Sequence, residues 1–250
     1  MAVFCNTHRG KSLEGLERSL AIIRKSFFLL ILLSTLCFQV FSQNALEDGN
    51  LLRFPLWALI DEVPSLEYQN DDSKQFFDFS VERLKELGPF VIEGMVYGWK
   101  FSYTPYDKKR NVAENFVYEK VAEIPKKDPS LKYGEVWLDN GRLNCWVQYA
   151  RSKAMMQNYY AWLSVKNPKI HAQGMGKLIS GIEGIKDAYA EAIKNAVRSY
   201  AQGLTKNKPT EITGTVLLTD YPRLIVQHGY YLADLSFYLE IADIRKYNYY

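Results

Sequence analysis

The chain has 250 residues, of which 31 are Lys or Arg and 28 are Asp or Glu, so its formal net charge is +3. Proteins that bind nucleic acids need clustered basic side chains to displace counterions from phosphates, and anionic membrane surfaces attract the same kind of cluster. The chain contains no such basic run, so its composition excludes a nucleic-acid partner and an electrostatic membrane-surface site.

Residues 24–45, RKSFFLLILLSTLCFQVFSQNA, contain the most apolar run of the chain. Its strongly apolar part, 27–41, has about 15 residues, fewer than the roughly 20 that a membrane-spanning helix requires. A basic pair precedes it and Val40-Phe41-Ser42 follows it, which is typical of a signal peptide cleaved after Ser42. We therefore expect residues 1–42 to be a signal peptide and the mature protein to be periplasmic or secreted, without a transmembrane segment.

Two features leave alternatives open in this region. Cys37 could be lipidated and anchor the chain to a membrane, although Leu36 is larger than the residue that normally precedes a lipidated cysteine. The stretch before Arg24 contains acidic residues, which is unusual for an export signal. A translation start near residues 20–23 would leave a compact signal, so residues 1 to about 19 are expected to be untranslated or without function.

The residues after the cleavage position are formally neutral. Five basic and two acidic residues precede that position, which leaves 26 of each sign in the mature chain. Cys145 is the single mature cysteine, so an internal disulfide is excluded and stability must come from the core. All 18 Tyr and all 5 Trp lie in this part of the chain.

The domain organisation is predicted from these patterns. Residues 43–70 mix acidic, polar and isolated apolar side chains, and we expect an irregular N-terminal arm that packs Phe54, Trp57 and Ile60 onto the rest. No Pro/Gly/Ser linker interrupts residues 71–250, which are predicted to form a single domain.

The first predicted elements are a helix and two strands. Asp71-Asp72-Ser73 is an N-cap signal, and Gly88-Pro89 is expected to end the helix that it opens. Residues 90–103, FVIEGMVYGWKFSY, are rich in β-branched and aromatic side chains and predict a long strand. Residues 111–124 fit a helix or a strand, and their position after a turn favours an antiparallel partner strand.

The most specific local signal is a β-hairpin around Asp139-Asn140-Gly141, because Asn and Gly tolerate the positive φ of a tight turn. Its second strand is expected to alternate faces, with Cys145 and Val147 on the face opposite Trp146.

A helix over 152–163, a loop over 169–184 and an amphipathic helix over 185–203 are predicted to follow the hairpin. Two further strands follow, over 211–220 and 223–244, the second with a bend at Gly229. The fold class is therefore α+β: an antiparallel sheet of about six strands with two or three packed helices, preceded by the signal peptide.

No catalytic or metal-binding constellation is found in the sequence. Cys145 could act as a nucleophile with His171 or His228 as its base, but its alternation with apolar residues favours a core position. With two mature histidines and no HExxH or CxxC motif, the sequence predicts no metal and no cofactor.

The aromatic residues are the best candidates for function. Tyr97, Trp99, Tyr103 and Trp146 lie on or beside predicted strands, where exposed rings could stack on sugars or contact a protein. The sequence therefore favours an exported bacterial cell-envelope protein of binding or structural type, non-catalytic, whose partner is an envelope protein or a glycan.

Two other functions stay open at this point. A periplasmic or secreted hydrolase could use Asp220 and His228 as its acid and base. A small outer-membrane barrel is a weaker alternative, because about six strands are predicted and helices interrupt them.

Overall fold

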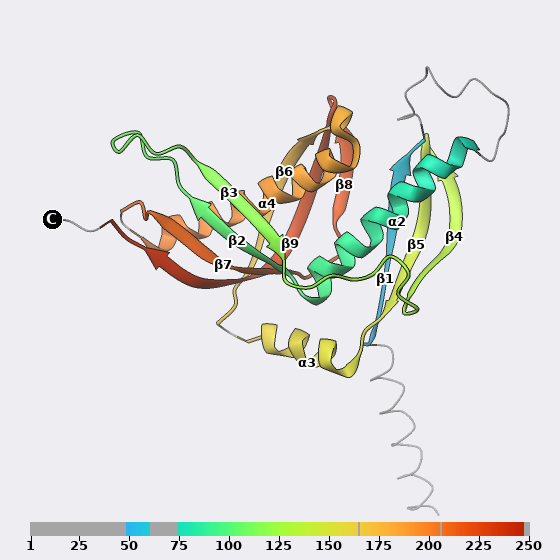
Figure 1. Ribbon diagram of the computed structural model, residues 1–250, viewed down its shortest axis with the longest axis horizontal. Helices are drawn as coiled ribbons and strands as arrows, with labels where there is room; N and C mark the ends of the chain where they lie inside the picture. Colours follow the sequence, from blue (N-terminus) through green and yellow to red (C-terminus); the bar gives the residue numbers. More distant parts are fainter. Residues whose placement is uncertain (1–48, 61–74, 165, 206, 248–250) are drawn as a thin grey trace, which may run out of the picture. The chain divides into compact units, whose positions relative to one another are not determined.

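The computed structural model describes residues 49–60, 75–164, 166–205 and 207–247, and within them the fold is α+β with two antiparallel sheets (Figure 1). Leu51–Tyr250 form one compact unit, to which the following description applies. The signal peptide predicted for residues 1–42 lies outside the described residues, as do the start of the first predicted helix and the arm residues 43–48 and 61–70.

The smaller sheet has three strands in the order β1-β5-β4. Their bounds are Leu51–Leu59 for β1, Arg142–Ala150 for β5 and Leu131–Asp139 for β4. Helix α2, Gln75–Val96, packs on β1 and β5. The predicted β4–β5 hairpin is confirmed, since Asn140 and Gly141 both have positive φ, 48° and 71°.

The larger sheet has six strands in the order β3-β2-β7-β9-β6, with β8 beside β9. The bounds of its strands in chain order are Trp99–Thr104 for β2, Asn115–Lys120 for β3, Lys169–Lys177 for β6, Glu211–Leu218 for β7, Arg223–Gln227 for β8 and Tyr230–Arg245 for β9. Helix α3, Lys153–Trp162, connects the two sheets along the chain and lies within the helix predicted for 152–163; Ser152 is its N-cap. Helix α4, Gly181–Leu204, packs on β6 and β9.

The predicted antiparallel sheet of about six strands with two or three helices is confirmed, and the three-stranded sheet is an addition to it. Part of that sheet comes from the predicted arm, because residues 51–59 form β1 instead of irregular chain. Phe54, Leu56 and Ala58 alternate into the core, and Pro55 is tolerated because β1 is an edge strand.

Helix α2 is longer than predicted. It passes through Gly88-Pro89 and ends at Val96, so residues 90–96 are helical and the following strand begins at Trp99. Pro89 removes one helical hydrogen bond, but the residues that follow it are buried on all sides, and this burial outweighs the local stop signal. Gly98 caps this end of the helix: its φ is 79° and its N–H donates to the Glu93 carbonyl.

Residues 169–177 form β6 instead of the predicted loop. Gly174 and Gly176 face α4 so closely that a Cβ atom on Gly176 would lie 1.8 Å from the Gly184 carbonyl oxygen. The two glycines therefore allow a strand and a helix to approach, and do not mark a loop. The small residues of α4, which include Ala188 and Ala192, are buried against them.

The long C-terminal run also differs from its prediction. Residues 223–245 form two strands, β8 and β9, joined by a turn at His228-Gly229, where φ is 51° and 78°. The predicted bend at Gly229 is therefore a complete hairpin.

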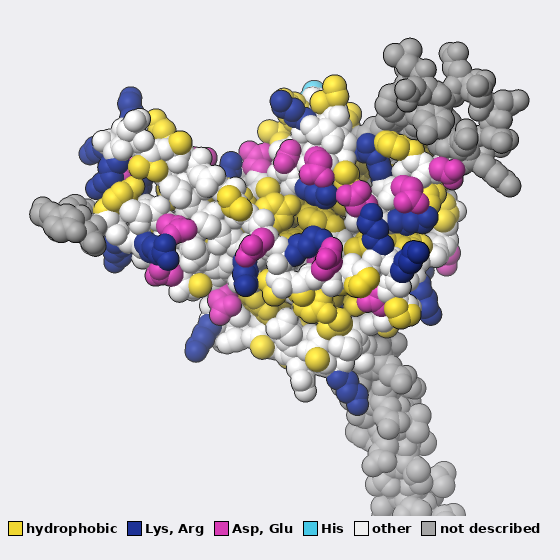
Figure 2. Space-filling view, in the orientation of Figure 1, with side chains coloured by type: hydrophobic (Ala, Val, Ile, Leu, Met, Phe, Trp, Pro, Cys, Tyr) yellow, Lys and Arg dark blue, Asp and Glu magenta, His cyan; other side chains and the backbone are white. Residues whose placement is uncertain are grey.

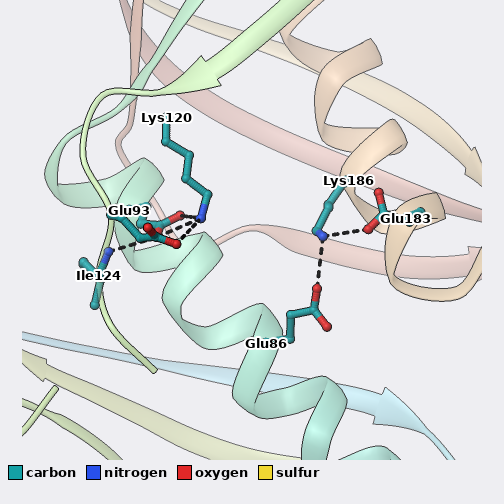
Figure 3. A network of polar contacts seen from close by, with 7 residues as sticks. Glu86, Glu93, Lys120, Ile124, Glu183 and Lys186 are labelled. Atoms are coloured by element: carbon teal, nitrogen blue, oxygen red, sulfur yellow. Dashed lines mark hydrogen bonds and ion pairs between the residues drawn. The ribbon is translucent and has the colours of Figure 1, made fainter. Parts of the chain in front are cut away.

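Two polar contacts hold α2 against its neighbours (Figure 3). The buried carboxylate of Glu93 accepts hydrogen bonds from the Ile124 N–H at 2.9 Å and from the Lys120 ammonium at 3.2 Å. Lys186 of α4 donates to Glu86 of α2 at 3.1 Å and to Glu183 at 2.7 Å. These contacts fix the helix that supports the three-stranded sheet.

Candidate functional site

Two of the four predicted binding residues are buried. Trp99 has no exposed surface, and its ring packs against Phe90 at 5.2 Å and Tyr189 at 6.1 Å between ring centroids. Tyr103 is 2% exposed and donates its hydroxyl to Glu114 at 2.8 Å. Both side chains are buried, so the prediction that Trp99 and Tyr103 form an exposed contact surface is wrong.

The other two predicted residues lie nearer to solvent. Tyr97 is partly buried and packs against the core at the end of α2. Trp146 is partly exposed on β5, on the face opposite the buried Cys145 and Val147. The structure therefore keeps Trp146 as a surface aromatic and separates it from the other three residues.

Trp146 belongs to a group of tryptophans and arginines whose positions alternate with the buried residues of the three-stranded sheet; one of them, Trp57, is partly buried and also packs against Tyr231 of β9. We call this group the aromatic–arginine face; its members are Arg53, Trp57, Trp137, Arg142 and Trp146. In the strand register Trp57 and Trp137 both lie opposite Asn144 of the central strand, β5. Three strands thus contribute a side chain of this group to one surface.

A β-bulge directs Trp137 to this side. The register of β4 shifts between Gly134 and Val136, and Glu135 has a positive φ of 44°. Because successive side chains of a strand alternate between faces, Trp137 would lie on the core side if the residue at 135 were paired normally. The bulge turns it outward, and the ring is 38% exposed.

The rings and guanidinium groups of the face form two sets of contacts, Arg53–Trp146–Trp137 and Arg142–Trp57. The Arg53 Cζ atom lies 4.5 Å from the ring centroid of Trp146, and the Arg142 Cζ atom lies 4.2 Å from that of Trp57. The Trp137 and Trp146 centroids are 6.1 Å apart. Such cation–π and aromatic contacts restrict the side chains before a partner arrives, which reduces the entropy lost on binding.

The charge of the face is mixed. Arg53 also forms an ion pair with Glu135 at 3.5 Å, and both side chains are largely exposed. On the side of the molecule that Figure 2 shows, Lys and Arg side chains are likewise interspersed with Asp and Glu. Recognition at the aromatic–arginine face must therefore come from ring surface and guanidinium geometry more than from net charge.

The nucleophile considered in the sequence is a core residue. Cys145 is 2% exposed, and burial raises the pKa of its thiol to about 11. His171 forms a hydrogen bond with Asp234 on the neighbouring strand instead of approaching Cys145. Cys145 therefore lacks the neighbouring base that would activate it.

The acid/base pair considered for a hydrolase is not assembled. Asp220 accepts a hydrogen bond at 2.9 Å from Lys169, at the first residue of β6, and this bond lowers the pKa of its carboxyl. His228 lies at the other end of β6: the carbonyl of its neighbour Gly229 accepts a hydrogen bond from the N–H of Leu178, the residue that follows β6. Eight residue steps of about 3.3 Å separate the two ends of that strand, or about 26 Å.

The described residues contain no group of three or more His, Cys, Asp or Glu side chains placed to hold a metal ion. Among the described helices, none is long and apolar enough to cross a membrane.

Trp137 is the exposed tryptophan of the face that sequence reasoning did not select for binding, whereas Trp57 packs against the core as predicted and was not selected as a member of the face. Trp57 could have been found from the alternation of Arg53, Pro55 and Trp57 with apolar residues in β1. Trp137 could not, because its side depends on the bulge at Glu135.

Comparison with known proteins places the chain among relatives without assigning an activity. A protein of Treponema pallidum (strain Nichols), described as an "Uncharacterized protein", is 29% identical over 212 residues, which cover 85% of this chain and 88% of the relative. None of the solved structures matches the chain. One protein-family model matches residues 40–247, and the chain belongs to the family that this model describes.

Proposed function

We propose that this protein is an exported, non-catalytic component of the bacterial cell envelope that binds a protein partner through the aromatic–arginine face. The observation that carries the proposal is the contact of Trp137 and Arg53 with Trp146 on one side of a small sheet, beside the partly buried Trp57 with Arg142 over its ring. Trp and Arg are the residue types that most often contribute large shares of binding energy at protein interfaces.

The stacking also favours a protein over a glycan. A sugar binds a tryptophan through a free ring face, whereas guanidinium groups already cover one face of Trp57 and one face of Trp146. A protein partner can use the exposed ring edges together with the remaining N–H donors of Arg53 and Arg142. A glycan is therefore treated as the competing outcome of the test.

Export is supported by the sequence on either side of the proposed cleavage position. The apolar run is too short to span a membrane, and Val40-Phe41-Ser42 fits a signal-peptidase site. The family match begins at residue 40, close to that position, so the region shared by the family corresponds to the proposed mature protein. N-terminal sequencing of the native protein should return Gln43 as the first residue; an acylated Cys37 would contradict soluble export.

Crosslinking in the native envelope tests the binding surface. The expected result is one protein that is captured stoichiometrically by the wild type and by Tyr221→Ala, and lost with Trp137→Ala and Trp146→Ala. Tyr221 is a matched control because it is an aromatic residue, 50% exposed, outside the face. Capture that is unchanged in both tryptophan variants, with melting temperatures equal to the wild type, would refute the proposal.

Arg53→Ala distinguishes the two partner classes. Removing the guanidinium uncovers a face of Trp146, so a glycan should bind more tightly to the variant while a protein partner should bind more weakly. Truncation of a central interface residue typically costs 2 kcal/mol or more, about 30-fold in Kd. Tighter binding of soluble envelope glycan fragments by Arg53→Ala would therefore reject the protein partner.

A further inference from the structure

A second candidate site, independent of the aromatic–arginine face, is a cavity of about 410 Å³ at the C-terminal part of α4. Its walls come from three parts of the chain that are distant in sequence: the end of β2 with the residues before β3, the last two turns of α4, and the segment that leads into β7. The lining residues used below are Tyr103, Glu114, Arg198, Ala201, Lys208 and Ile212. This volume is within the range of small-molecule pockets in proteins, about 300 to 1,000 Å³.

One part of the wall is apolar and well ordered by the core. Ile212 has no exposed surface, Ala201 is 5% exposed, and Pro105 and Pro209 complete this side. The ring of Tyr103 closes the inner end, and its hydroxyl is held by the hydrogen bond to Glu114. Burial and the neighbouring carboxylate raise the pKa of Tyr103, so its hydroxyl stays protonated at neutral pH.

The other part of the wall is charged, with a positive excess. Glu114 is surrounded by Lys194 and by Arg198, each 3.8 Å from one of its oxygens, and it also accepts from Tyr103. Lys208 donates to the Tyr106 carbonyl at 2.7 Å and keeps two further N–H donors. The charged lining residues are thus two cations, Arg198 and Lys208, and one carboxylate, Glu114, which Lys194 also approaches.

Arg198 is the group best placed for a ligand. Its contact with Glu114 at 3.8 Å is longer than a hydrogen bond, and within the described residues its guanidinium makes no hydrogen bond. A guanidinium presents a planar fork of N–H donors that matches a carboxylate in a two-bond arrangement. The cavity therefore places the N–H donors of the Arg198 guanidinium beside an apolar wall.

We infer that this cavity binds a small organic carboxylate whose charged end is held by Arg198 and whose apolar body lies against Ala201 and Ile212. Lys208 adds positive charge at the same rim, and Glu114 orients the arginine without occupying its donors. The apolar wall selects against inorganic anions, since these would leave it in contact with water.

Titration of the full mature chain with benzoate, followed by amide NMR shifts, tests this inference. Saturable shifts are expected at Gln202 and Thr205, which also line the cavity. Arg198→Gln should weaken benzoate binding about 10-fold or more and Arg198→Lys less, while Arg223→Gln, at an exposed arginine on β8, should leave it unchanged. Benzylamine, which has the same ring and the opposite charge, should not bind.

Any of three results would overturn the inference. These are the absence of saturable benzoate shifts at tens of millimolar, equal binding of benzoate by wild type and Arg198→Gln, and binding of inorganic phosphate that equals or exceeds that of benzoate. Because Arg198 is 54% exposed, its variants should keep the wild-type melting temperature, which serves as the control for folding.

Discussion

Replacing Gly176 of β6 by Ala should strongly destabilise the protein. An added Cβ atom would lie 1.8 Å from the Gly184 carbonyl oxygen and 2.9 Å from the Ala188 nitrogen. Both atoms belong to the backbone of α4, so no side-chain rotation can relieve the overlap. The strand and the helix would have to separate by more than about 1 Å, which opens the packed contact along the small residues of α4.

The expected cost follows from that geometry. Overpacking of a core typically costs 1 to 3 kcal/mol, and contact with backbone places Gly176→Ala at the upper end, about 3 kcal/mol. For a unit the size of Leu51–Tyr250, each kcal/mol lowers the melting temperature by about 2 to 4 °C. We therefore expect a decrease of about 6 to 12 °C, measured by circular dichroism or calorimetry.

Gly203→Ala is the control, since it makes the same change on α4, the helix that β6 packs against, at a position where an added Cβ meets nothing within 4 Å. Alanine is favoured over glycine in a helix by about 0.5 to 1 kcal/mol, so this variant should be equally or slightly more stable than the wild type. Equal melting temperatures for Gly176→Ala and Gly203→Ala would refute the close-approach explanation of the β6 glycines.

Three further predictions follow from buried polar groups. Burial raises the pKa of Cys145 to about 11, so at pH 8 the folded protein carries about 100-fold less thiolate than an exposed cysteine would. Ellman's reagent should therefore react with Cys145 chiefly after denaturation. Fast reaction in buffer would place Cys145 at the surface. Glu93→Ala should lower the free energy of unfolding, measured in urea, by about 2 to 3 kcal/mol, because it leaves the buried Ile124 N–H without its acceptor. Glu93→Gln keeps an acceptor and should lower it less. An equal decrease in both variants would assign the effect to charge alone. The hydrogen bond from Arg110 lowers the pKa of Asp107 in the folded protein. The stability that this carboxylate contributes is therefore present above the ordinary aspartate pKa and is lost as the pH falls through the folded-state pKa. Asp107→Asn should lower the melting temperature at pH 7, and the difference from the wild type should disappear toward pH 2.

The local turn signals were sufficient to predict several elements. Asn140-Gly141 predicted the hairpin because few residues accept its positive φ values, and Gly229 predicted a bend at a position where φ is 78°. Both signals act within a few residues, where tertiary contacts have little influence. The same kind of reasoning failed at Gly88-Pro89, where burial of the following residues extended α2.

The site depended on contacts between distant segments, which explains why it was only partly predicted. Trp99 and Tyr103 alternate with Lys100 and Ser102, a pattern that already indicated a buried face of β2. Trp146 was correctly placed opposite Cys145, but its neighbour Trp137 reaches the same side through a bulge that no local pattern reveals. The arginines that stack on these rings come from β1 and β5, so the face exists only after the sheet has formed.

The central claim is that the aromatic–arginine face is covered by a partner in the cell envelope. Hydroxyl-radical footprinting of the protein in native envelope fractions and in purified form measures this coverage whatever the identity of the partner. The oxidation of Trp137, which is 38% exposed in the free protein, should fall several-fold in the envelope, while that of Tyr221 should stay unchanged. Equal oxidation of Trp137 in the two preparations would contradict the claim.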